Sequence, residues 1–248
     1  MKTKVLKIAA MLLAALLPVM TACTQNGTQQ GSQSAQSDQL VQETEAVSAS
    51  DSGVQPTITG EISHDTWTES QTSTVSFVRF PATFAAWEQA RSVLGTEPQG
   101  AVALQVMAFE LFRRDAEAGK RALEMNNTAT NYTQTLRQLQ QVMDVKDTYY
   151  ARPYLAAALL KGATPDNGYQ PEEPYQLVVR VNPVSKYQQS EMLGGTVIYL
   201  QVDSQGWDTN WRGVEVVKPE GQQYYVVSNC PALYTQCKKI NGEWAELK

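Results

Sequence analysis

The stretch LLKGATPDNGYQPEEPY, residues 159–175, separates two parts of the chain whose apolar residues follow different periods. Before it, apolar residues recur every three to four positions, as they do on the buried face of an α-helix. After it they alternate, beginning with QLVVRVN, as in a β-strand with one buried face. Helices followed by strands, rather than the two in alternation, indicate the α+β class. We therefore predict one domain over residues 75–248, with a helical part at 81–162 and a β part at 175–248.

Four to five helices are expected before the stretch. Thr83 and Gly95 are a cap residue and a stop residue on either side of the first, and Pro98 stands in the first turn of the second. The second is apolar almost all round, which predicts a buried central helix. The expected helices cover residues 84–94, 98–113, 115–126, 132–144 and 147–161.

Four to six antiparallel strands are expected after the stretch, forming a β-meander on which the helices pack. TVIYLQVD, residues 196–203, alternates apolar side chains with others, as a half-buried strand does. Turn sequences separate the segments, among them PEGQ at 219–222 and Asn241–Gly242, a strong signal for a hairpin. One further short strand is expected from Val75, ahead of the helices.

The stretch itself is predicted to be a joint between the two parts, although its tyrosines and carboxylates also suit a binding site. Its glycine at the helix end can adopt the left-handed conformation, and the proline three residues later prevents the helix from resuming. DNG is typical of a turn, and the later prolines hold an extended approach to the first strand. The two tyrosines are expected to pack over the seam between helices and sheet. The residues that define this loop motif are Gly162, Pro165, Asn167, Gly168, Tyr169, Pro174 and Tyr175.

The first 23 residues are typical of an export signal. MKTKVLK is basic, and the apolar run at 8–19 is too short to cross a bilayer, which takes about 20 residues. Met-Thr-Ala-Cys at 20–23 resembles a bacterial lipobox, which implies that Cys23 is diacylated and becomes the first residue of the mature protein. The alternative is a simple secreted protein in which Cys23 is incidental. We expect a lipoprotein of the bacterial cell envelope, anchored to a membrane by this lipid and facing away from the cytoplasm.

Residues 24–74 are predicted to be a disordered tether. They are rich in Ser, Thr and Gln, and they contain few apolar residues before Trp67. Such a composition buries too little apolar surface to offset the entropy of ordering. The tether would allow the folded domain to stand away from the membrane.

The charge balance argues against nucleic acid as a partner. The chain has 20 basic and 25 acidic side chains, a net charge of −5, and three of the basic ones belong to the signal. An acidic body without a basic stripe argues against binding to nucleic acid. The expected partners are the membrane, reached through the lipid, and an envelope protein, peptide or glycan.

With Cys23 assigned to the lipid, Cys230 and Cys237 remain. They stand seven residues apart in an exported protein, so a disulfide between them is plausible. The alternative is two unpaired thiols. A zinc site is not expected, because no histidine lies near them.

No catalytic constellation emerges from the sequence, and no metal or cofactor is expected. The single histidine, His64, lies in the predicted tether, and no glycine-rich phosphate loop is present. Glu172 and Glu173 are adjacent, and adjacent carboxylates on an extended chain diverge instead of flanking one bond.

Aromatic residues are the better candidates for binding. Trp207, Trp211 and Arg212, in GWDTNWRG, are a possible ligand-binding set, because exposed indoles beside an arginine can stack a sugar or hold a peptide. The alternative is that both indoles cover the end of the sheet core. A second group, expected mainly between helices and sheet, comprises Tyr149, Tyr150, Tyr154, Tyr169 and Tyr175.

RPYLAAALLKGATPDNGYQPEEPY, residues 152–175, resembles the signature of an uncharacterised bacterial domain family found in exported proteins and lipoproteins. That signature is a helix ending in KGATP-x-NGY-x-P-x-x-PY before a small β-sheet. Residues 77–112 and 212–226 are similar to other segments of the family, so the resemblance covers about residues 77–227. The chain departs from the pattern at 154–156 and at Tyr224. The family has no established activity, so the resemblance implies domain limits and no catalytic residues.

The expected function is that of a non-enzymatic binding or interaction module in the cell envelope. Two alternatives stay open at this point. One is an envelope hydrolase that acts on wall polymer or glycan through carboxylates that the sequence does not identify. The other is the solute-binding component of a transporter, although two α/β lobes are not visible in the sequence.

Overall fold

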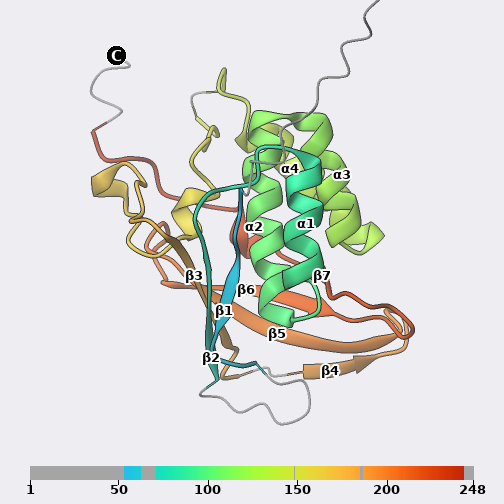
Figure 1. Cartoon of the computed structure of the whole chain (residues 1–248). Helices are drawn as coiled ribbons and strands as arrows, with labels where there is room; N and C mark the ends of the chain where they lie inside the picture. The colour runs from blue at the N-terminus through green and yellow to red at the C-terminus, as the bar shows by residue number, and fades with distance from the viewer. Residues whose placement is uncertain (1–52, 63–70, 148, 185–186, 243–248) are drawn as a thin grey trace, which may run out of the picture. The chain divides into compact units, whose positions relative to one another are not determined.

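The computed structural model describes residues 53–62, 71–147, 149–184 and 187–242, all within one compact unit. The predicted α+β class is confirmed: helices occupy the first half of this part, and most of an antiparallel sheet follows (Figure 1). The α-helices are α1 (Phe84–Leu94), α2 (Pro98–Arg114), α3 (Ala116–Asn126) and α4 (Ala129–Val142). None of the helices in the described ranges is both long enough and apolar enough to span a membrane.

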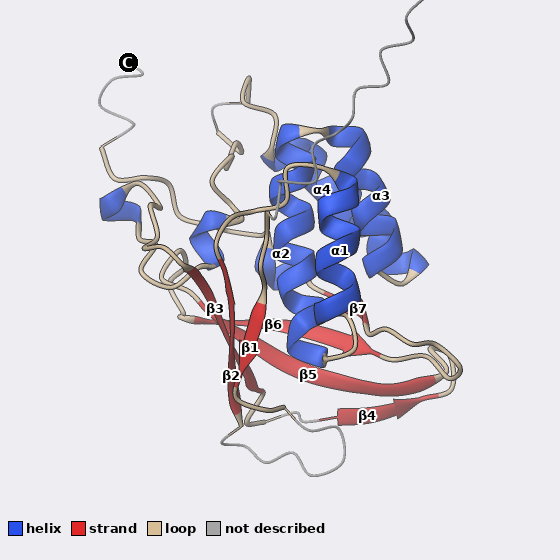
Figure 2. Ribbon diagram, viewed as in Figure 1, coloured by secondary structure: helices blue, strands red, loops and turns tan. Residues whose placement is uncertain are grey.

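Within the described residues the sheet has seven strands, and all pairs of neighbours are antiparallel. Their order across the sheet is β1-β2-β3-β5-β6-β7, with β4 beside β5 on the side of β3. The helices lie together on one face of the sheet (Figure 2). The strands are β1 (Thr57–Thr59), β2 (Thr72–Phe77), β3 (Tyr175–Val181), β4 (Tyr187–Ser190), β5 (Gly195–Asp203), β6 (Trp211–Val217) and β7 (Val226–Asn229).

Helix α2 lies at the centre of the core, as its apolar composition predicts. Every residue from 98 to 112 is buried, and α2 contacts α1, α3 and the strands β2, β6 and β7. The indole of Trp87 on α1 donates a hydrogen bond to the carbonyl of Leu104, 3.0 Å away. Gly119 lets α3 approach closely, because a Cβ there would lie 2.2 Å from the Cα of Phe112.

The prediction of a fifth helix over residues 147–161 is wrong. Of that range only Ala157–Leu159 is helical, as one 3₁₀ turn. The carboxylate of Asp147 accepts hydrogen bonds from the amides of Tyr149 and Tyr150 and so forms a turn. Pro153 then disfavours helical geometry at Arg152, whose amide donates instead to the carbonyl of Val142. The apolar residues that suggested a helix are buried in an irregular segment.

The range predicted as a tether, residues 24–74, contains β1 and the first residues of β2, so that prediction is wrong for this part. Val54 and Ile62 are buried in the core, and the amide of Val78 donates to the carbonyl of Val54 over 3.1 Å. A few spaced apolar residues suffice here because β2 provides backbone partners for the segment. Residues 24–52 and 63–70 lie outside the described residues, as does the signal of residues 1–23.

The hairpin expected around Asn241–Gly242 has no first strand, because residues 234–240 are irregular. Their backbone groups bond to separate loops instead of to a neighbouring strand. The amide of Lys238 donates to Gly206, and that of Asn241 donates to Pro165. Residues 243–248, where the second strand was expected, lie outside the described range.

Candidate functional site

The loop motif holds itself together through Asn167. The Asn167 side chain accepts a hydrogen bond from the amide of Thr164 and donates to the carbonyls of Gly162 and Gln170, at 2.9, 2.9 and 3.1 Å. The Thr164 hydroxyl in turn accepts from the amide of Asn167. Gly162 and Gly168 have φ of +81° and +67°, a region that glycine adopts without strain. Pro165 opens the 3₁₀ turn Pro165–Asn167, and Pro174 directly precedes β3.

Tyr169 ties this loop to the C-terminal segment. Its φ is +55°, and its side chain is buried. The ring stacks on that of Tyr154, with centroids 4.7 Å apart, and the hydroxyl donates to the carbonyl of Lys238 over 3.0 Å. Burial raises the pKa of Tyr169 far above its ordinary value. The Tyr169 hydroxyl therefore stays protonated and can donate this hydrogen bond, and Tyr169 thereby positions the loop.

Tyr175, the first residue of β3, sits in a second aromatic group. Its ring centroid lies 5.6 Å from that of Phe77 and 5.4 Å from that of Phe80. Two causes raise the pKa of Tyr175: burial has the larger effect, and the nearby carboxylate of Glu173 has the next largest. The two tyrosines of the motif therefore lie at the seam, as expected, but in different ring clusters.

A cavity of about 440 Å³ lies between these clusters, and we call it the aromatic groove. It combines residues of the loop motif with residues from α2 and from the irregular segment at 153–157. Rings of tyrosine, phenylalanine and proline supply much of its wall, and two arginines stand near one glutamate. The lining residues are Phe80, Glu110, Arg113, Arg114, Pro153, Tyr154, Ala157, Tyr169, Gln170, Pro171 and Tyr175.

The charged part of the groove is a compact cluster at the end of α2. The Glu110 carboxylate is nearly buried, with 6% exposure, and it accepts bonds from Arg113 Nε and Nη2 at 2.8 and 2.6 Å and from Arg114 Nε at 2.7 Å. The hydrogen bonds to Glu110 raise the pKa of Arg113. Two guanidinium groups against one carboxylate leave one positive charge, and both arginine side chains are partly exposed. Sequence reasoning missed this cluster, because its i, i+3, i+4 spacing looks like an ordinary pattern of ion pairs on a helix.

The predicted set Trp207, Trp211 and Arg212 does not form one open surface. Trp207 is buried, and its indole donates to the carbonyl of Thr235 over 2.6 Å. The Arg212 guanidinium lies 5.1 Å from the Trp207 ring and donates to the carbonyl of Ala232. Trp211 precedes Arg212 directly on β6, so it points to the opposite face of the sheet. There Arg180 stacks on it at 3.7 Å.

Cys230 and Cys237 are free buried thiols, so the predicted disulfide is not formed. Each sulfur faces a different environment, although the residues are close in sequence. The sulfur of Cys230 lies 3.5 Å from both the Asn131 amide nitrogen and the Thr135 hydroxyl, and that of Cys237 lies 4.0 Å from the Tyr169 hydroxyl. Burial raises the pKa of Cys230, and that of Cys237 to about 12.

Acidic groups do not gather into a metal site in the part of the chain that the structure describes. There, no three His, Cys, Asp or Glu side chains lie where they could hold one metal ion. Glu172 and Glu173 are both exposed. Cys23 and His64 lie outside the described residues.

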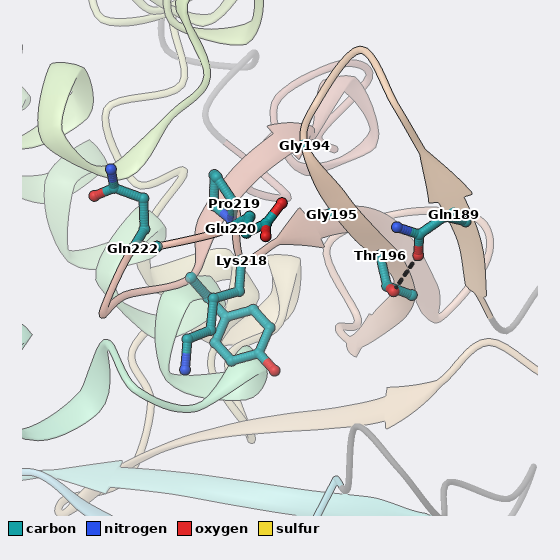
Figure 3. Close-up of a pocket in the computed structure, with 10 residues that line it drawn as sticks. Gln189, Gly194, Gly195, Thr196, Lys218, Pro219, Glu220 and Gln222 are labelled. Carbon is teal, nitrogen blue, oxygen red and sulfur yellow. Dashed lines mark hydrogen bonds between the residues drawn. The ribbon is translucent and has the colours of Figure 1, made fainter.

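A second cavity, of about 500 Å³, lies among the turns at the ends of β4, β5 and β6. Figure 3 shows that the long side chains around it point in different directions, with Gln222 far from Gln189. The side-chain oxygen of Gln189 accepts a hydrogen bond from the Thr196 hydroxyl, 2.7 Å away. Much of the remaining wall is turn residues such as Gly194 and Gly221, together with Gly195 at the start of β5. The aromatic groove, with its rings and guanidinium groups, offers the richer chemistry.

A family model described as a domain of unknown function (DUF6935) matches residues 79–241. No curated protein and no solved structure matches the chain. The matched range includes every residue that lines the aromatic groove, whereas β1 and β2 precede it.

Proposed function

This chain belongs to the family of the domain of unknown function DUF6935, and we propose that it is a non-catalytic binding module of the bacterial cell envelope. Its ligand occupies the aromatic groove. The observation that supports this is the combination, in one cavity of about 440 Å³, of stacked tyrosine rings with partly exposed arginine side chains. Concave sites with apolar walls and a few placed polar groups are the usual form of a binding site.

The chemistry of the groove favours binding over hydrolysis. Hydrolysis of a glycan takes two carboxyl groups on opposite sides of the bond that breaks. Among the described residues, Glu110 is the only acidic one that lines the groove, and both of its oxygens already accept hydrogen bonds from arginine. A carboxylate held in this way serves as a counter-ion that orients the two guanidinium groups.

In this proposal the module is anchored to a membrane by a lipid attached to Cys23. The basic start, the apolar run at 8–19 and the Met-Thr-Ala-Cys sequence support this part. Mass spectrometry of the mature N-terminus is expected to find a diacylated cysteine at position 23, and Cys23→Ser is expected to abolish processing and membrane retention. An unmodified Cys23 in the mature protein would refute the anchor.

Binding at the groove is tested by photo-crosslinking in cells. A photoreactive phenylalanine analogue replaces Gln170, which is exposed and lines the groove, or Gln140, which is exposed on α4 and serves as the matched control. We expect a discrete adduct of higher mass from position 170 and none from position 140. Absence of an adduct at 170, or the same adduct from both positions, would contradict the proposed binding module.

A further inference from the structure

The walls of the aromatic groove suit a chain of proline rings. The half-buried ring of Tyr154 is backed by the buried ring of Tyr169 at an interplanar angle of 18°, and the half-buried Pro153 and Pro171 line the same cavity. Flat rings of this kind recognise the polyproline II conformation, whose proline rings pack against aromatic faces. Such a ligand is already extended before it binds, so it loses little conformational entropy.

Outside the two arginines, the Tyr169 hydroxyl and the Glu110 carboxylate of the groove are already engaged, and this disfavours a glycan. A sugar presents many hydroxyl groups, each of which needs a donor or an acceptor once it is buried. The Tyr169 hydroxyl already donates to Lys238, and the Glu110 oxygens accept from arginine. The Tyr175 hydroxyl lies beside Glu173. What the groove mainly offers to a ligand is ring surface.

The arginine cluster adds a preference for negative charge. Arg113 and Arg114 together bear one positive charge more than Glu110 neutralises, and their side chains are 37% and 43% exposed. A guanidinium has five N–H donors, and Glu110 takes two from Arg113 and one from Arg114. The other donors form no hydrogen bond with the residues that the structure describes. They suit a carboxylate on the ligand.

We infer that the aromatic groove binds an extended, proline-containing polypeptide segment that carries acidic side chains. The rings hold the prolines, and Arg113 and Arg114 hold a carboxylate next to them. This inference rests on the proposed binding function and specifies its ligand: a protein partner with a Pro- and Glu- or Asp-containing segment.

Synthetic peptides test the ligand class directly. The mature protein in detergent micelles is titrated with the fluorescent peptides PPEPPEPPE, PPQPPQPPQ and PPKPPKPPK. We expect the acidic peptide to bind about tenfold more tightly than the neutral one, as one charged hydrogen bond predicts. The basic peptide is expected to bind most weakly, and added salt should reduce the difference. Equal affinity for the acidic and basic peptides, or no binding of any peptide, would overturn the inference.

A charge-matched pair of variants locates the interaction. Arg114→Gln removes one guanidinium and leaves the two bonds from Arg113 to Glu110 in place. Lys120→Gln removes the same charge at a partly exposed site outside the groove. We expect Arg114→Gln to weaken binding of the acidic peptide about tenfold and Lys120→Gln to leave it unchanged. Equal effects of the two variants would show that only net charge matters and would overturn the site.

The cellular adduct separates this inference from the proposed function. If mass spectrometry of the adduct formed from position 170 finds peptides of a second protein, the partner is a polypeptide, as inferred. If it finds no second protein and a glycosidase lowers the mass of the adduct, the ligand is a glycan, so the inference fails while the binding module stands. If no adduct forms, the proposed function itself fails.

Discussion

At the scale of single residues, the environment of Cys237 decides its chemistry. The thiol is 3% exposed, lies beside the Tyr169 hydroxyl, and belongs to the segment whose carbonyls hold Arg152 and Tyr169. A thiol must ionise before it can attack a disulfide or an alkylating reagent. Because burial raises the pKa of Cys237 to about 12, the sulfur acts as a small apolar side chain under the loop.

This pKa predicts how stability depends on pH. Between the ordinary thiol pKa of 9.0 and about 12, the folded protein keeps the Cys237 proton while the unfolded chain loses it. The contribution of Cys237 is therefore fully present below pH 9.0 and is lost as pH rises through this window. We expect the free energy of unfolding to fall by up to about 1.4 kcal/mol per pH unit more steeply in the wild type than in Cys237→Ala. Urea unfolding of both proteins across this window measures the slopes, and parallel slopes would contradict the prediction.

At the scale of elements, a buried amide cluster connects α2, α3 and α4. Gln105 Oε1 accepts hydrogen bonds from the side-chain amides of Asn126 and Asn127 at 3.0 and 2.9 Å, and Asn131 donates to Asn127. All four side chains are buried in surroundings that are otherwise mainly apolar. Buried amides are tolerated where they are hydrogen-bonded, as these are. The bonds fix the positions of the three helices relative to one another. The backbone of Thr128 extends the connection to β7 by donating to the carbonyl of Val227.

Gln105→Leu tests the cluster. The substitution removes the acceptor that Asn126 and Asn127 share. Each amide keeps one backbone acceptor, the carbonyl of Ala101 or of Leu123, but its other N–H loses its partner, and such a buried unpaired donor costs about 1–3 kcal/mol. We expect the free energy of unfolding to fall by at least about 2 kcal/mol. Gln140→Leu, the same change at an exposed position on α4, is the control and is expected to be nearly neutral. A Gln105→Leu variant as stable as this control would show that the amides do not hold the helices.

At the scale of the whole molecule, the segment before the family domain completes the fold. Strand β1 pairs with β2 in the register Thr57 to Ser76, and β2 pairs with β3. Val54 and Ile62, on either side of β1, are buried in the same core as α2. The sheet therefore begins before the first residue of the DUF6935 match at 79.

Truncation distinguishes a structural segment from a tether. We compare a chain that begins at Gly53 with one that begins at Gln71. Complete burial of one Val or Ile side chain contributes about 1.5–3 kcal/mol, so losing both should lower the free energy of unfolding by at least about 3 kcal/mol. Chemical denaturation measures the difference. Two chains of equal stability would show that residues 53–70 contribute nothing to the fold.

Much of the architecture follows from short-range patterns in the sequence. The starts of α1, α2 and α3 were predictable because Thr83, Pro98 and Asp115 act within one helical turn. The α+β class follows from the change of period across residues 159–175. The helix predicted over 147–161 failed because local turn bonds and Pro153 outweigh an apolar composition, which says only that a segment is buried.

The sequence by itself determined where α1, α2 and α3 begin and that helices give way to strands across residues 159–175, because caps, turns and periodicity depend on residues a few positions apart. The α+β class also follows from the sequence, whereas export and the lipid on Cys23 stay predictions. The tertiary structure alone decided the candidate site. Phe80, Glu110, Tyr154 and Tyr175 come from four separate segments, and no local pattern connects them. Their meeting depends on how α2, the loop and β3 pack, which is a sum of many contacts between residues distant in the chain.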